Sequence, residues 1–163
     1  MIATIGLVIN IVSLVVGLAI ILLLVTATYG GVQQKARNTK RQVDVQSMQT
    51  QLESFYSDKG HYPSLADINS ASWRSTNLNG LDSNALEDPS SPSVSKLASS
   101  PTPKQYSYQV TDSQGASCEN DDTKCAQYTL TATYEGTENG QKTITADSLT
   151  KSDPNNSDPA TLK

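Results

Sequence analysis

The sequence has few of the residues from which enzymes build active sites. Its 163 residues include one histidine, His61, two cysteines and no phosphate-binding glycine loop. The spacing of its serines, acids and lone histidine suggests no nucleophile–base–acid set. One histidine and two distant cysteines also fall short of the four ligands of a closed zinc site. We therefore expect no enzymatic activity and no cofactor.

Charge is absent from the start of the chain. Residues 1–29 contain no charged side chain and consist mostly of Ile, Val, Leu, Ala and Gly. About 20 helical residues cross a hydrocarbon layer of about 30 Å, so this run predicts a membrane-spanning helix. A secretory signal has a basic residue before a shorter apolar run, so we expect a retained anchor.

Asn10 is a polar exception inside this apolar run. An amide in lipid gains about 0.6–2 kcal/mol from a hydrogen bond to another helix. Asn10 is therefore either a contact between copies of the chain or a residue placed near one membrane face.

Prolines and turn clusters are also missing between residues 30 and 59, apart from Gly30-Gly31. The helix is expected to continue through this region, with Gly60 just after its end. Apolar residues recur there at spacings of three, four and seven, which predicts an amphipathic stripe. The stripe consists of Val32, Ala36, Val43, Val45, Met48, Leu52, Phe55 and Tyr56.

Residues 60–104 are rich in Ser, Asn and Pro and predict mostly loop. One short helix is expected near the start of this region, with Ser64 as its N-cap and Asp67 three residues later. Residues 69–103 are then predicted to be loop, and Trp73 is expected to anchor that loop to the core.

The last third of the chain alternates polar and apolar residues over 105–111, 127–134 and 142–146, which predicts three half-buried strands. Asn139-Gly140 marks a tight turn between the second and third strands. The fold class expected is α+β, a long N-terminal helix with a C-terminal antiparallel β-meander packed on it. The chain thus divides into an apolar helix at 1–29, its amphipathic continuation at 30–59, loops at 60–104, a sheet at 105–149 and a tail at 150–163.

The two cysteines, Cys118 and Cys125, flank a short acidic loop. A local disulfide is expected in an extracytoplasmic domain, and two reduced thiols are the alternative. The oxygens of Glu119, Asp121 and Asp122 are weak calcium candidates, but they lack an EF-hand pattern and equally fit a solvated turn.

Four cations, Lys35, Arg37, Lys40 and Arg41, follow the apolar run. The net charge is −4, so subtracting these four leaves −8 on the remainder. Attraction between this basic collar and the acidic head of a neighbouring copy is expected to be weak, at about 0–1 kcal/mol per exposed pair. Direct binding of nucleic acid is not expected, because the head is acidic. The collar favours a cytoplasmic position, whereas the cysteines favour an exposed one, and removal of a basic leader before Met1 would reconcile the two.

Two motifs follow the charge-free apolar run. The first lies at Lys35-Ala36-Arg37-Asn38-Thr39-Lys40-Arg41. The second and more specific one is Leu52-Glu53-Ser54-Phe55-Tyr56, followed after three residues by Gly60-His61-Tyr62-Pro63-Ser64-Leu65. With these motifs the chain resembles the type IV pilin and pseudopilin family, including pilin-like proteins of monoderm and candidate-phylum bacteria. The resemblance covers residues 1–68 well and the sheet in outline.

The resemblance implies a subunit that is held in the cytoplasmic membrane, with its head extracytoplasmic, and then polymerises into a surface filament for adhesion, twitching or DNA uptake. The partners implied are copies of itself and a membrane assembly machinery. Met1 is then either the processed and methylated first residue or the start of an unprocessed chain. The alternatives are a non-polymerising membrane-tethered binding module and a pseudopilin of a secretion or competence system. The helix-core assembly residues expected are Ile5, which stands where the family usually has Glu, and Leu7, Asn10, Val12, Val16 and Ile20.

Overall fold

The computed structural model describes residues 2–118 and 124–148, without the side chains of 2–5, 7–9 and 25–28. The expected tail at 150–163 lies outside these residues. The described chain forms two units, Met1–Ala36 and Arg37–Lys163, and each is considered by itself.

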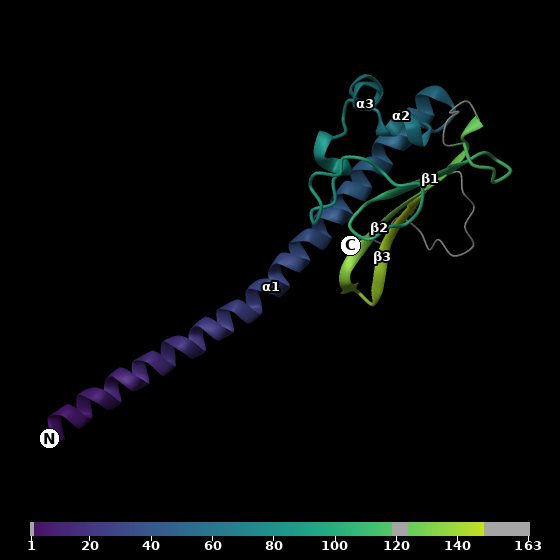
Figure 1. Ribbon diagram of the computed structural model, residues 1–163. Coiled ribbons are helices and arrows are strands. Elements are labelled where there is room, and N and C mark those ends of the chain that lie inside the picture. The colour runs from purple at the N-terminus through teal and green to yellow at the C-terminus, as the bar shows by residue number, and fades with distance from the viewer. Residues whose placement is uncertain (1, 119–123, 149–163) are drawn as a thin grey trace. The chain divides into compact units, whose positions relative to one another are not determined.

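A single helix, α1, runs from Ile2 to Lys59 (Figure 1). The continuous helix predicted from the lack of proline is confirmed, and Gly30-Gly31 does not interrupt it. At its end, Gly60 takes the left-handed conformation with φ 78° and donates its N–H to the carbonyl of Tyr56 at 2.8 Å. Glycine adopts this conformation at little cost, so it terminates the helix as expected.

The predicted three-stranded antiparallel meander is also confirmed. Strands β1 (Ser107–Thr111), β2 (Gln127–Glu138) and β3 (Gln141–Asp147) lie side by side in the order β1-β2-β3 (Figure 1). Asn139 and Gly140 both have positive φ, 50° and 80°, as a tight hairpin turn requires. The pairing of β2 with β3 shifts register between Thr133 and Glu138. This shift frees part of the β2 backbone from the sheet ladder.

The core of the second unit lies between α1 and the sheet. Val45, Met48, Leu52 and Phe55 of α1 are buried together with residues of β1 and β2 and with Tyr106, which precedes β1. The buried residues of these strands include Tyr108, Val110, Tyr128, Leu130 and Ala132.

The predicted helix stripe is wrong at its N-terminal end. Val43 is 58% exposed, and Val32 and Ala36 are exposed as well. The buried face instead continues through Asn38 and Arg41, each 1% exposed. Polar residues can occupy a buried face only when they are hydrogen-bonded, so hydrophobicity alone could not identify this part of the interface.

Short helices join α1 to the sheet. Helix α2 (Leu65–Asn69) confirms the predicted cap, because Ser64 Oγ accepts the N–H of Asp67 at 3.1 Å. A second helix, α3 (Ala71–Asn77), and a 3₁₀ turn, η1 (Ser83–Leu86), lie where only loop was predicted. Trp73 anchors α3 to the core as expected, with its ring centroid 5.2 Å from that of Phe55.

Candidate functional site

The first candidate site is the apolar segment of α1. Every described large apolar side chain between residues 11 and 24 is exposed, from 51% at Val16 to 69% at Leu23. The helix is long and apolar enough to span a membrane. An all-round apolar helix belongs in lipid or among other apolar helices, because water solvates it poorly. The segment therefore requires an environment other than water.

The expected assembly residues fall on this segment. Val12, Val16 and Ile20 are exposed apolar residues, and Asn10 is an exposed polar one. Their contacts with other copies are not tested by a single chain. The side chains of Ile5 and Leu7, and Met1 as a whole, lie outside the described residues.

The second candidate site is a polar network where α1 enters the second unit. Its first member, Asn38, is both a hydrogen-bond donor and an acceptor to the backbone of β2. Its Oδ1 accepts the N–H of Glu135 at 3.0 Å, and its Nδ2 donates to the carbonyl of Glu135 at 3.2 Å. Glu135 lies within the shifted register of β2, so the Asn38 amide satisfies backbone groups in that irregular stretch.

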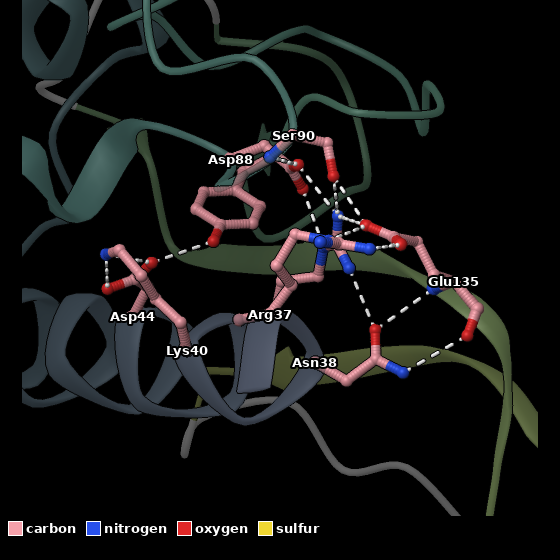
Figure 2. A network of polar contacts seen from close by, with 9 residues as sticks. Arg37, Asn38, Lys40, Asp44, Asp88, Ser90 and Glu135 are labelled. Atoms are coloured by element: carbon pink, nitrogen blue, oxygen red, sulfur yellow. Dashed lines mark hydrogen bonds and ion pairs between the residues drawn. The ribbon is translucent and has the colours of Figure 1, made fainter. Parts of the chain in front are cut away.

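Arg41 is the centre of the network. Figure 2 labels its partners Asn38, Asp88, Ser90 and Glu135. Its Nε and Nη2 donate to the two carboxylate oxygens of Asp88 at 2.7 and 2.8 Å, and its Nη1 donates to Asn38 Oδ1 at 2.8 Å. Nη2 also reaches Ser90 Oγ at 2.7 Å and Glu135 Oε1 at 3.1 Å. Both Arg41 and Asp88 are 1% exposed at the side chain, so this is a buried ion pair whose charges are closely hydrogen-bonded.

The pKa values in the network favour the charged forms. Hydrogen bonding from Arg37 lowers the pKa of Glu135 to about 2. Burial by itself raises the pKa of Asp88, but hydrogen bonds from Arg41 and Ser90 outweigh it, so that pKa lies below its ordinary value. Burial likewise opposes the charge of Arg41, and its carboxylate partners Asp88 and Glu135 raise its pKa nonetheless. The network is therefore ionised at neutral pH.

A neighbouring ion pair extends the network along α1. Lys40 Nζ lies 2.8 Å from both oxygens of Asp44 (Figure 2). Asp44 also accepts the hydroxyl of Tyr106 at 2.8 Å. Burial, followed by this carboxylate, raises the pKa of the Tyr106 hydroxyl, so the tyrosine remains a neutral donor. Asp44 thus connects α1 to the residue that immediately precedes β1.

Three of the four cations of the basic collar have partners within the chain. Arg37, Lys40 and Arg41 form ion pairs with Glu135, Asp44 and Asp88, and a single chain does not test the expected attraction to a neighbouring copy. Of the four cations, Lys35 alone is exposed with no ion pair among the described residues. The signal that sequence reasoning missed is the heptad-like spacing of Asn38 and Arg41 from the apolar positions 45, 48, 52 and 55.

The predicted disulfide is confirmed. Cys118 and Cys125 are bonded, with their Cα atoms 5.9 Å apart, and both are buried. The backbone carbonyl of Cys125 accepts the N–H of Tyr62 at 2.8 Å, which ties this loop to the chain after α1. The calcium candidates Glu119, Asp121 and Asp122 lie outside the described residues.

Residues of the most specific family-like stretch have packing roles here. The Glu53 carboxylate accepts the hydroxyl of Tyr62 at 2.9 Å and that of Tyr128 at 2.8 Å. The Tyr62 ring stacks on Tyr56 at a centroid distance of 4.5 Å. Tyr108 donates its hydroxyl to the carbonyl of Pro63 at 2.8 Å. These contacts fasten the end of α1 to the sheet.

In the part of the chain that the structure describes, no group of three or more His, Cys, Asp or Glu side chains is placed to hold a metal ion. The described chemistry is thus that of an exposed apolar helix and a buried ionic network.

No protein-family model, curated protein or solved structure matches this chain.

Proposed function

We propose that this chain is a structural subunit of a surface filament similar to type IV pili, and that it polymerises through the apolar segment of α1. The observation that carries the proposal is the exposure of every described large apolar side chain between residues 11 and 24. A second unit with its own core and disulfide supports the same proposal, because a filament needs a stable subunit body.

The segment suits two successive environments. In the monomer, lipid surrounds the apolar side chains, and the second unit remains extracytoplasmic. In the filament, equivalent helices from other copies replace the lipid, so apolar surface stays out of water throughout. The partners proposed are copies of this chain, the membrane before assembly and a membrane-bound assembly machinery. Nucleic acid is not proposed as a direct ligand.

A membrane-tethered binding module that never polymerises is the main alternative, and it also needs an apolar helix. The two functions differ in where the mature chain accumulates. Filaments should be sheared from intact cells, imaged by electron microscopy and digested for peptide identification. We expect peptides of this chain as a main component of the filaments. If the chain is recovered only from membranes, and the filaments lack its peptides, the polymer proposal is wrong.

The N-terminus of the filament subunit gives a second test. Intact-mass measurement and fragmentation of the purified subunit should find Met1 as the first residue, carrying an added methyl group. A longer or unmodified N-terminus would contradict the proposed processing, but leave polymerisation to be judged by the filaments themselves.

A further inference from the structure

A pocket of about 300 Å³ lies at α3 and η1 and shares no lining residue with either site described above. The polar residues that line it are Arg74, Ser75, Asn79 and Ser83, and the Ser75 hydroxyl donates to the carbonyl of Ser72 at 2.9 Å. Apolar surface is supplied by Ala71, Leu78 and Leu81. This volume is at the lower end of the range for small-molecule sites, which combine apolar walls with a few polar groups.

Arg74 differs from the other two arginines of the chain. Arg37 and Arg41 are each paired with carboxylates, whereas Arg74 forms no ion pair with any described residue. Its Nη1 donates to the backbone carbonyl of Ile68 at 2.6 Å, which fixes the orientation of the guanidinium. The side chain is half-buried, and burial lowers its pKa. A ligand carboxylate would supply the counter-charge that this partly desolvated guanidinium lacks among the described residues.

We propose that this pocket binds a small hydroxylated carboxylate, of the chemical class of the uronic acids. One guanidinium presents a planar fork that matches a single carboxylate. A phosphate dianion is less suitable, because Arg74 is the only cation on the described wall of the pocket. The serine hydroxyls and the Asn79 amide match ligand hydroxyls, and the leucines match a carbon skeleton.

The full chain in detergent micelles should be titrated with glucuronate by isothermal calorimetry, with glucose, acetate and inorganic phosphate as comparison probes. Saturable binding of glucuronate at millimolar concentration is expected, at least tenfold tighter than that of glucose or phosphate. Acetate should bind more weakly than glucuronate, because it lacks the hydroxyls. Absence of saturable binding, or equal affinity for glucose, would overturn the proposal, and tighter binding of phosphate would overturn the ligand class.

Two variants make the assignment specific to this pocket. Arg74→Gln should weaken glucuronate binding at least tenfold, whereas Lys96→Gln, which removes a cation outside the pocket wall, should not. Asn79→Asp is a second test that keeps Arg74. It should also weaken glucuronate binding, because the new carboxylate on the pocket wall competes with the ligand for the guanidinium. Asn79 is exposed, so the fold should tolerate this change. Unchanged affinity in Asn79→Asp, with a native circular dichroism spectrum, would place the binding elsewhere.

Discussion

The pair formed by Arg41 and Asp88 gives a sharp prediction about single residues. Asp88→Asn leaves a guanidinium that is 1% exposed without its main counter-ion. Breaking a buried ion pair by removing one partner typically costs about 3–5 kcal/mol, and we expect about 3 kcal/mol because Glu135 still reaches Arg41. Urea unfolding of the full chain in detergent, followed by Trp73 fluorescence, measures this loss.

The control for this prediction is Asp82→Asn. Asp82 is exposed and accepts the N–H of Asn84, which an asparagine can also do. Its effect should stay below about 0.5 kcal/mol. In an Arg41→Met background, Asp88→Asn should lose most of its cost, because no buried cation then needs it. Equal costs in both backgrounds would contradict the role assigned to the pair.

Glu135 predicts a specific dependence of stability on pH. Its folded pKa of about 2 lies below the ordinary 4.5, so the unfolded chain binds a proton at higher pH than the folded chain does. The stabilising contribution is therefore complete above about pH 5 and is lost as pH falls towards 2. Asp88 acts in the same direction. Unfolding free energies measured across this range should fall with acid, and Glu135→Gln should flatten the curve. A curve of identical slope in the variant would refute the assignment.

Single residues also show where sequence reasoning reached its limit. Hydrophobic periodicity identified Val45, Met48, Leu52 and Phe55, because burial of apolar surface is the signal it detects. It missed Asn38 and Arg41, whose burial depends on Asp88 and Glu135, more than 40 positions along the chain. The heptad-like spacing of Asn38 and Arg41 places them on the buried face of the helix. No local pattern identifies their partners, however, because the tertiary fold supplies Asp88 and Glu135.

Among the elements, the loop closed by the Cys118–Cys125 disulfide is the simplest to test. Replacing both Cys118 and Cys125 by serine should lower the unfolding free energy by about 2 kcal/mol, since the closed loop is short. Without the disulfide, the carbonyl of residue 125 should also be held less firmly against the N–H of Tyr62. Chemical denaturation gives the energy, and alkylation with mass spectrometry gives the thiol count. Two free thiols in protein purified without reductant would show that the bond does not form in the cell.

The accuracy of the element predictions follows from the strength of each local signal. The three strands and the Asn139-Gly140 turn were predictable because alternation and positive φ leave clear residue patterns. Helix α3 was missed because its Ser, Thr and Asn residues carry no apolar period. It is held instead by the Ser70 cap and by the contact of Trp73 with Phe55.

For the whole molecule, the proposed assembly depends on keeping the apolar helix free of charge. Val12→Asp should abolish filaments, because an unpaired carboxylate in an apolar bundle is strongly unfavourable. Electron microscopy of sheared material measures filament number, and membrane fractionation shows whether the chain still inserts. Loss of filaments with membrane insertion retained is the expected result.

Two matched variants define that experiment. Val94→Asp places the same charge on an exposed valine of the second unit, and filaments should remain. Val12→Leu keeps the apolar character, and filaments should also remain. Normal filament numbers in Val12→Asp would count against a helical core built from this segment.

The position of the Arg37–Asn38–Arg41 cluster has a mechanical consequence. The second compact unit begins at Arg37, so tension carried along α1 enters that unit at its ionic contacts before it reaches the apolar core. Several bonds to Glu135 and Asp88 share this load, and both acceptors remain ionised at neutral pH. A chain pulled through α1 would therefore resist extension first through its ion pairs and only afterwards through its apolar packing.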